Sequence, residues 1–338
     1  MLILMKKDHS PEQLKAVQDR VKGMGFNSHV IPGEHSVAVG VTGNQTRISP
    51  DDFASLPGVE QAIPVTKSYK LASRAFSAKG FSIPVGDVTF SQDTFVIIGG
   101  PCAVESEDQT IRIAKKVKAL GARVLRGGAF KPRTSPYSFQ GLGLEGLKIL
   151  ASARKETGLP VITEALDSRG LEQVYQYADI IQIGARNMQN FSLLQEAGKL
   201  DKPVMLKRGM SATLDEWLAA AEYILEQGNK NVILCERGIR SFDNHARNML
   251  DLTAVPILKD LSHLPIVVDP SHGTGRRDKV LPMSLGAMAV GANGIIVDVH
   301  DRPQEALCDG PQALLPEEFE TLVQKLHKLA GALEVKMG

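Results

Sequence analysis

The stretch VLRGGAFKPRTSPYSFQGLG, residues 124–143, joins a short apolar run to a loop that carries three closely spaced cations. The apolar run ends at Leu125, and Arg126, Lys131 and Arg133 follow among glycines and prolines. The three positive charges repel one another, so anionic groups bound among them would stabilise the loop. Arginine offers a planar fork for carboxylate or phosphate oxygens, and lysine offers a compact charge. A strand followed by such a loop therefore predicts an anion-binding site, with a solvated basic loop as the alternative.

Apolar runs of the same kind recur from residue 94 onward. Most are near-continuous, which is typical of strands buried on both faces. The runs span residues 95–98, 123–125, 160–163, 180–183, 203–206, 231–234, 265–268 and 294–299. Helical patterns separate most of them, for example at residues 107–120, 144–155, 168–177, 214–226 and 282–290. Eight alternating strands and helices predict an α/β fold, the (β/α)8 or TIM barrel, over residues 95–338. An open doubly wound sheet is the alternative, but it favours a glycine fingerprint where this chain has Gly-Gly-Pro.

Residues 1–66 have a pattern of their own and predict a separate small domain. Ser10 and Pro11 are typical of the start of a helix, and Gly25 is typical of its end. This helix lies in the order strand, helix, strand, strand, helix, strand, which is the ferredoxin-like α+β arrangement. The strands are predicted at residues 2–5, 26–31, 36–41 and 59–65, and the second helix at residues 50–56.

The predicted strands at residues 2–5 and 36–41 carry no aromatic side chains that could stack on RNA bases. A module that binds a small ligand or forms oligomers is therefore the better prediction for this domain. Residues 67–94 have mixed charge with glycine and proline punctuation, which predicts a linker that runs into a short hairpin with its turn at residues 85–87.

Composition excludes several classes of protein. The 338 residues include 39 Lys and Arg against 38 Asp and Glu, a formal charge of +1, which argues against a nucleic-acid-binding surface. The cysteines at positions 102, 235 and 308 have neither zinc-finger spacing nor the pattern of a disulfide framework. The N-terminal apolar run is too short for a signal peptide, and no run is long enough to span a membrane. We therefore expect a cytoplasmic protein without membrane or nucleic-acid partners.

In a TIM barrel the active site lies on the loops that follow the carboxyl ends of the strands. Six cationic residues fall at such positions: Arg126, Lys131, Arg133, Arg186, Lys207 and Arg237. Each charge-assisted hydrogen bond to a substrate contributes about 1.5–3 kcal/mol to binding. Six cations therefore predict substrates that together carry about two phosphates and a carboxylate.

A second group at the same end of the barrel predicts a metal site. It comprises Cys102, His272, Asp298 and Asp309. One thiolate, one imidazole and two carboxylates suit a borderline-soft divalent ion, which could be zinc, iron, cobalt or manganese. Alone, Cys102 would be interpreted as a small packing residue.

The motifs GPCAVES, LRGGAFKPRTSPYSFQG, IQIGARN, LKRG, CERGIR and VDPSHGTGRRD together resemble 3-deoxy-D-arabino-heptulosonate 7-phosphate (DAHP) synthases. The chain is most similar to the subgroup whose barrel follows a ferredoxin-like regulatory domain. The related 3-deoxy-D-manno-octulosonate 8-phosphate synthases share the barrel but usually have Lys-Ala-Asn-Arg in the loop after strand two. Pro132 between Lys131 and Arg133 therefore favours erythrose 4-phosphate over arabinose 5-phosphate.

The resemblance implies condensation of phosphoenolpyruvate with erythrose 4-phosphate, the first step of the shikimate pathway to aromatic amino acids. It places phosphoenolpyruvate on Arg126, Arg186, Lys207 and Arg237, and the phosphate of erythrose 4-phosphate on Arg133 and Thr134. It also implies one divalent metal ion on Cys102, His272, Asp298 and Asp309. Lys131 would lie between the substrates as a proton donor, and Glu164 would position a water molecule. A homotetramer and an aromatic amino-acid effector on the N-terminal domain are implied in the same way.

One position departs from the family pattern. Asp298 stands where the family usually has Glu, which is longer by one methylene, roughly 1.5 Å. Metal sites tolerate only about 0.2 Å in ligand distance, so the identity and affinity of the metal stay open. Cys308, beside Asp309, suggests a further hypothesis: if it lies near Cys102, oxidation would form a disulfide and eject the metal.

Two alternatives to the synthase remain. One is a phosphate-handling barrel aldolase that forms a Schiff base through Lys131 or Lys207. The other is a metabolite-binding regulator whose barrel no longer turns over, which only the shortened side chain at Asp298 supports.

Overall fold

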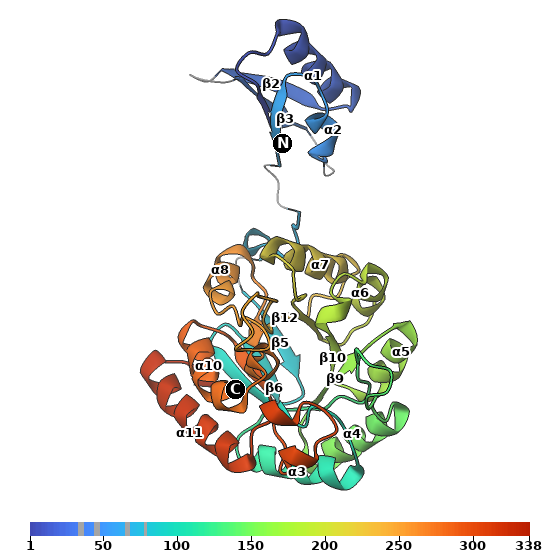
Figure 1. The fold of residues 1–338 in the computed structure, drawn as a ribbon, viewed down its shortest axis with the longest axis vertical. Helices are drawn as coiled ribbons and strands as arrows, with labels where there is room; N and C mark the ends of the chain where they lie inside the picture. The colour runs from blue at the N-terminus through green and yellow to red at the C-terminus, as the bar shows by residue number, and fades with distance from the viewer. Residues whose placement is uncertain (33–36, 44–47, 65–67, 78–79) are drawn as a thin grey trace. The chain divides into compact units, whose positions relative to one another are not determined.

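The computed structural model describes residues 1–32, 37–43, 48–64, 68–77 and 80–338. They form two compact units, Met1–Ser68 and Tyr69–Gly338 (Figure 1). The predicted domain boundary after residue 66 lies outside the described residues, as do the predicted strand ends at residues 36 and 65.

The first unit is a four-stranded antiparallel sheet in the order β2-β3-β1-β4 with two helices. Its elements are β1 (Leu2–Met5), α1 (Pro11–Gly23), β2 (Asn27–Pro32), β3 (Val37–Thr42), α2 (Asp51–Ala54) and β4 (Val59–Ile63). Ser10 caps α1 and forms a capping box with Gln13, which satisfies backbone N–H groups at the helix start. Ile3 and Val17 meet in its core, so the strand and helix are held together by apolar burial. The order and pairing are ferredoxin-like, as predicted.

The second unit is a closed parallel barrel. Eight strands follow the order β14-β13-β12-β11-β10-β9-β8-β7, and β14 also pairs with β7. They are β7 (Thr94–Gly100), β8 (Val124–Arg126), β9 (Val161–Ala165), β10 (Ile180–Ile183), β11 (Val204–Lys207), β12 (Val232–Glu236), β13 (Ile266–Val268) and β14 (Gly294–Asp298). Because the last strand pairs with the first, the TIM-barrel prediction is confirmed and the open-sheet alternative is wrong.

The helices surround this barrel, as the ring of ribbons in Figure 1 shows. They are α3 (Glu107–Ala119), α4 (Leu144–Thr157), α5 (Ser168–Tyr177), α6 (Phe191–Gly198), α7 (Leu214–Glu226), α8 (Ala254–Leu261), α9 (Pro270–Thr274), α10 (Arg277–Ala289) and α11 (Pro316–Leu333). The predicted start of a helix at residue 282 is wrong, because α10 begins at Arg277 and Pro282 lies inside it. Buried contacts of Val280 and Ala287 with the barrel core outweigh the proline's cost to the helix.

A two-stranded hairpin, β5 (Ser82–Val85) and β6 (Val88–Ser91), precedes the barrel. Ile83 and Phe90 of the hairpin belong to the same buried cluster as Val96 and Ile98 of β7 and Ile162 of β9. The hairpin therefore packs against the side chains that fill the inside of the barrel. After α11, the short strand β15 (Lys336–Met337) pairs with the start of β7.

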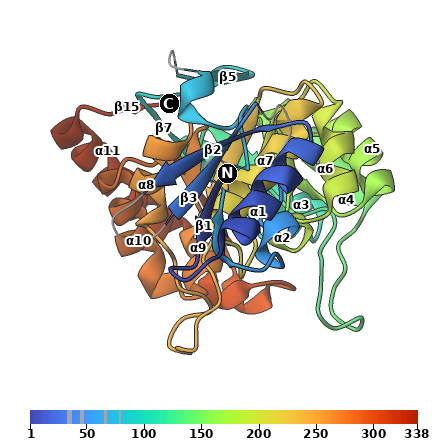
Figure 2. The same ribbon diagram turned by 90° about the horizontal axis from the view of Figure 1, so that it is seen from above.

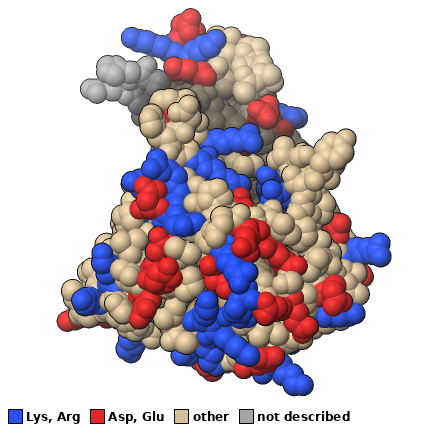
Figure 3. All heavy atoms as spheres, turned by 60° about the horizontal axis from the view of Figure 1, so that its bottom comes forward, with Lys and Arg blue, Asp and Glu red and all other residues tan. Residues whose placement is uncertain are grey.

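The loops at the carboxyl ends of the strands project on one side of the barrel. Figure 2 shows two of them clearly, the loop between β8 and α4 in green and the loop between β12 and α8 in orange. On the face drawn in Figure 3, positive and negative side chains are interspersed. Among the described residues, none of the helices combines the length and apolar character needed to cross a membrane.

Candidate active site

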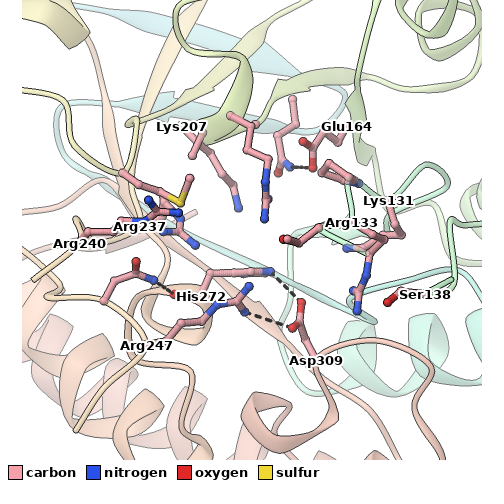
Figure 4. A pocket seen from close by; sticks show the side chains of 18 of the residues that line it. Lys131, Arg133, Ser138, Glu164, Lys207, Arg237, Arg240, Arg247, His272 and Asp309 are labelled. Carbon is pink, nitrogen blue, oxygen red and sulfur yellow. Dashed lines mark hydrogen bonds and ion pairs between the residues drawn. The ribbon is translucent and has the colours of Figure 1, made fainter. Parts of the chain in front are cut away.

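A cavity of about 450 Å³ opens at the carboxyl ends of the barrel strands. Its lining contains eight cationic side chains against two carboxylates, and Figure 4 shows them converging on one space. The cations are Arg126, Lys131, Arg133, Arg186, Lys207, Arg237, Arg240 and Arg247, and the carboxylates are Glu164 and Asp309. All six cations predicted from the sequence are therefore brought together, along with Thr134 and His272.

The barrel places these side chains because parallel strands end at the same edge. Arg126 is the last residue of β8 and Lys207 the last of β11, while Arg237 follows β12 directly. Arg186 lies in a 3-10 turn, η2 (Ala185–Asn187), just after β10. Four of the five consecutive strands from β8 to β12 thus each contribute one cation, and the fifth, β9, carries Glu164.

Arg126 and Lys207 are buried, and each has a carboxylate partner. Arg126 Nη1 donates to Asp298 Oδ1 and to the carbonyl of Pro101, and Lys207 Nζ donates to Asp269 Oδ2 at 2.6 Å. Burial alone would lower the pKa of both cations, but Asp298 and Asp269 outweigh it and raise both pKa values. Within the described part of the chain, the buried Nε of Arg126 has no hydrogen-bond partner. Arg126 therefore keeps its charge and one donor available for a ligand.

Lys131 lies against Cys102. Its Nζ is 3.0 Å from the Cys102 carbonyl and 3.2 Å from the Cys102 Sγ. A Cβ at Gly128 would lie only 2.7 Å from Lys131 Cδ and 2.8 Å from the Cys102 carbonyl, so glycine is required for this approach. Burial would lower the pKa of Lys131, but the sulfurs of Cys102 and Cys308 outweigh it and raise the pKa. The lysine is therefore protonated at neutral pH.

The remaining cations are less fully paired. Arg133 Nη1 lies 2.6 Å from the Cys308 Sγ, and Thr134 lines the cavity next to it. In the described ranges, no carboxylate lies within ion-pair distance of Arg186, Arg237 or Arg240; these three arginines supply positive charge without a fixed protein counter-ion. Burial lowers the pKa of Arg237 from its ordinary value, and Asp269 opposes this effect.

Glu164 faces the cavity from β9. Gln182 Nε2 on the neighbouring strand β10 donates to Glu164 Oε2 at 3.2 Å, and both residues line the cavity. This fixed carboxylate is suited to orient a water molecule beside a cationic centre.

The four predicted metal donors also lie together, and they are joined by Cys308. The donor atoms form two groups that share Cys102: one with His272 and Asp298, and one with Cys308 and Asp309. Cys102 Sγ lies 3.7 Å from His272 Nε2 and 3.2 Å from Asp309 Oδ2. Atoms that share one small divalent ion are separated by similar distances.

Asp269 orients His272. The Asp269 carboxylate accepts from His272 Nδ1 at 3.1 Å, which leaves Nε2 facing Cys102, Asp298 and Asp309. A carboxylate behind the ring is the usual way in which proteins fix a metal-binding histidine. Burial would lower the pKa of His272, but Asp269 and Asp298 outweigh it and raise the pKa to about 9.

Asp309 and Asp298 differ in their partners. Asp309 has a left-handed backbone with φ of 54°, and Arg247 Nη1 donates to its Oδ1 at 3.1 Å, so Oδ2 is directed at the sulfurs. Burial would raise the pKa of Asp309, but His272 and Arg247 outweigh it and lower the pKa. Asp298 has both oxygens engaged, Oδ1 by Arg126 and Oδ2 by Gln312 Nε2 at 2.6 Å.

Sequence reasoning missed four residues of this site: Arg240, Arg247, Asp269 as the partner of Lys207 and His272, and Gln312. Arg240 and Arg247 lie in the irregular segment between β12 and α8, where no periodicity places side chains. In the sequence, only the basic character of a long loop after a barrel strand indicates that these two arginines belong to the site.

Comparisons with known proteins agree with this geometry. The family model described as the DAHP synthetase I family matches residues 71–334, and that of the DAHP synthase ferredoxin-like domain matches residues 1–67. A phospho-2-dehydro-3-deoxyheptonate aldolase of Thermotoga maritima is 49% identical over 337 residues, which is 100% of both chains. A 2-dehydro-3-deoxyphosphooctonate aldolase of Syntrophobacter fumaroxidans is 33% identical over 256 residues, 70% of this chain and 88% of that protein.

Two solved structures are also similar. The crystal structure of the Thermotoga maritima phospho-2-dehydro-3-deoxyheptonate aldolase (DAHP synthase) has a TM-score of 0.96 at 49% identity, covering 100% of this chain and 99% of that one. A truncated form of the 3-deoxy-D-arabino-heptulosonate 7-phosphate synthase from the same organism has a TM-score of 0.76 at 51% identity. It covers 80% of this chain and 100% of that one.

Proposed function

Because the chain belongs to the DAHP synthetase I family, we propose that it condenses phosphoenolpyruvate with erythrose 4-phosphate to give DAHP and inorganic phosphate. The observation that carries this proposal is the cavity with eight cations and two carboxylates. The two substrates together bring two phosphates and a carboxylate, and few small-molecule pairs demand so much positive charge in one site. The same reaction would make the protein a transferase of aromatic amino-acid biosynthesis.

Phosphoenolpyruvate would bind deep in the cavity. Arg126 and Lys207 at the strand ends are buried and charged, and Arg186 and Arg237 lack a carboxylate partner among the described residues. The free Nε of Arg126 is suited to a substrate oxygen, because a buried donor left without a partner costs about 1–3 kcal/mol. Arg133 and Thr134 would hold the phosphate of erythrose 4-phosphate nearer the loop, with Lys131 between the two substrates.

A divalent metal ion, which could be manganese, iron, cobalt or zinc, would bind beside Lys131. The Cys102 thiol, the Nε2 of His272 and an Asp309 oxygen face one another there, and this donor chemistry fits such an ion. Cys102, His272 and Asp309 would hold it; Asp298, the fourth predicted donor, already has both oxygens in hydrogen bonds. When bound, the ion supplies Lewis-acid polarisation of the aldehyde.

The protein groups would then perform the remaining work. The arginines and Lys207 hold the methylene carbon of phosphoenolpyruvate against the aldehyde carbon, so that a carbon–carbon bond can form. Lys131, protonated at neutral pH, donates a proton to the new hydroxyl group. Glu164 orients the water that adds to carbon two, after which phosphate leaves by carbon–oxygen cleavage.

The match to a ferredoxin-like domain of DAHP synthases supports a regulatory role for the first unit. We propose that it binds an aromatic amino-acid effector, that the protein is a cytoplasmic homotetramer, and that neither nucleic acid nor membrane is a partner.

The test is phosphate release from phosphoenolpyruvate with erythrose 4-phosphate, before and after EDTA treatment and after Mn²⁺ is restored. We expect activity that EDTA abolishes and Mn²⁺ recovers. Activity that survives EDTA would support the proposed reaction but contradict its dependence on a metal ion. Turnover only with arabinose 5-phosphate would support the reaction named for the 33% identical relative instead. Borohydride trapping of substrate on Lys131 or Lys207 would support a Schiff-base aldolase.

A further inference from the structure

Cys308 lies among the metal donors although the predicted ligand set does not include it. Its Sγ is 3.7 Å from the Cys102 Sγ and 3.4 Å from Asp309 Oδ2. Together with the 3.2 Å between Cys102 Sγ and Asp309 Oδ2, these distances close a triangle of donor atoms. Two thiolates on one zinc ion, each bonded at about 2.3 Å, lie at most about 4.6 Å apart, so the triangle has the size of a shared coordination sphere.

Asp298 has a hydrogen-bond donor on each of its two oxygens. Arg126 and Gln312 each donate to one of its oxygens, and the carboxylate is almost fully buried between them. An oxygen shared with the ion would accept a weaker hydrogen bond from Arg126 or Gln312, both of which are buried donors. Its hydrogen bond to Arg126 instead holds that guanidinium at the cavity wall.

We propose that Cys308 is a ligand of the active-site metal, which it binds together with Cys102, His272 and Asp309. Asp298 then acts as a positioning residue for Arg126. This assignment rests on the proposed metal-dependent function, and it changes the ligand set from one thiolate to two.

The charges around the two sulfurs agree with the assignment. Two thiolates and one carboxylate exceed the charge of a divalent ion by one. Lys131 Nζ, 3.2 Å from Cys102 Sγ, and Arg133 Nη1, 2.6 Å from Cys308 Sγ, supply the compensating positive charge. A site with two soft thiolates favours zinc, iron(II) or cobalt over manganese.

Cobalt spectroscopy tests the ligand set directly. Metal-free full-length protein is titrated with Co²⁺, and the near-ultraviolet thiolate-to-cobalt band is compared in the wild type, Cys308→Ser and Cys235→Ser. We expect Cys308→Ser to retain about half of the band per bound cobalt, because one of two thiolates is lost. Cys235 is the matched control: it lies in β12 with its side chain in the buried cluster inside the barrel, and its replacement should leave the band unchanged. A full-strength band in Cys308→Ser would overturn the assignment.

X-ray absorption at the zinc edge provides a measurement on the unmodified protein, in case the variant does not fold. We expect two sulfur scatterers at about 2.3 Å, and a single sulfur would overturn the assignment. Product formation by the wild type separates this result from the proposed function. Product formation by a protein with one sulfur ligand would support the proposed function and contradict the assignment of Cys308 as a ligand. Two sulfur ligands without product formation would support the ligand assignment and contradict the proposed function.

Discussion

At the scale of single residues, the cations of the cavity differ in whether the protein already supplies their counter-ion. Arg126 and Lys207 are held by Asp298 and Asp269, so their positions are set before any substrate arrives. Arg186 lacks such a partner in the described part of the chain, and Arg133 has only the Cys308 sulfur. Substrate anions should therefore gain most from the second pair, because these charges are not yet neutralised.

This difference predicts a reciprocal effect of two substitutions. Arg133→Ala should raise the KM for erythrose 4-phosphate, and Arg186→Ala the KM for phosphoenolpyruvate, each by about 10- to 100-fold. The factor follows from the loss of about 1.5–3 kcal/mol for a charge-assisted hydrogen bond. Steady-state kinetics with each substrate varied in turn measures both constants, and each variant serves as the control for the other. If both variants weakened the same substrate, the division of the cavity into two phosphate sites would be wrong.

The close approach of two sulfurs leads to a second prediction. In the metal-free protein, peroxide should convert the Cys308 thiolate to a sulfenic acid, and the Cys102 thiol should then displace water to form a disulfide. The sulfurs lie 3.7 Å apart, and the hydrogen bond from Cys102 lowers the pKa of Cys308. Peptide mapping without reductant should find the Cys102–Cys308 pair, dithiothreitol should restore metal binding, and Zn²⁺ added first should slow the reaction. Two free thiols after peroxide treatment would contradict it.

Much of the site could be predicted from the sequence, because a residue that follows a barrel strand has only one edge to occupy. Arg126 and Lys207 could be assigned in this way from their position alone. Arg247 and Gln312 could not, since they lie in irregular segments whose course depends on tertiary contacts. The partners of Asp298 were also unpredictable: its short side chain reaches Arg126 and Gln312, and no spacing in the sequence indicates this.

At the scale of elements, the barrel strands were predictable because each is a short apolar run buried on both faces. Helix boundaries were harder to predict where the helix propensity of a residue disagrees with tertiary packing. An example is α10, which contains Pro282 in its interior. Long-range ion pairs between elements leave no signal in a single sequence. Asp301, in the loop after β14, accepts from Arg112 Nε on α3 at 2.5 Å and so joins the first barrel helix to the last barrel loop.

This ion pair predicts a pH-dependent contribution to stability. Burial would raise the pKa of Asp301, but Arg112 and Lys116 outweigh it and lower the pKa. A carboxylate with a lowered pKa stabilises the fold above its unfolded-state pKa of about 3.9, and this contribution disappears as the pH falls through the folded-state value. Asp301→Asn should therefore lower the free energy of unfolding by about 1 kcal/mol at neutral pH, allowing for partial exposure to solvent.

Urea denaturation at pH 7 and pH 3 measures this difference, which should shrink at the lower pH. Asp108→Asn is the matched control, because Asp108 also contacts Arg112 but has 85% of its side chain exposed. Its replacement should change stability little at either pH. An Asp301→Asn effect of equal size at both pH values would show that the ionised pair is not its cause.

At the scale of the whole molecule, the barrel unit begins earlier than its first strand. Glu222 on α7 accepts hydrogen bonds from the backbone N–H groups of Lys70, Leu71 and Ala72 at 2.8–2.9 Å. The β5–β6 hairpin then adds Ile83 and Phe90 to the cluster inside the barrel. Residues 70–72 and the β5–β6 hairpin therefore contribute directly to the barrel's stability, although residues 67–94 have the composition of a linker.

Two truncations test this organisation and the role of the first unit. The fragment 69–338 keeps the Glu222 bonds and the hairpin, so we expect it to fold and to form DAHP. A solved truncated form of the Thermotoga maritima synthase covers 80% of this chain, which agrees with folding of a shortened chain. The fragment 95–338 loses Ile83 and Phe90 from a buried cluster, where large-to-small changes alone cost about 2–5 kcal/mol each, and should aggregate or melt at lower temperature.

Activity of the full chain and of the fragment 69–338 is then measured with tyrosine, phenylalanine or tryptophan added. An effector that binds the first unit can inhibit only the full chain, because the fragment lacks its site while retaining every residue of the catalytic cavity. Equal inhibition of both proteins would place the effector on the barrel instead. If the fragment 95–338 proved as stable as 69–338, the hairpin would have no part in the barrel core, and the barrel would be self-sufficient from β7 onward.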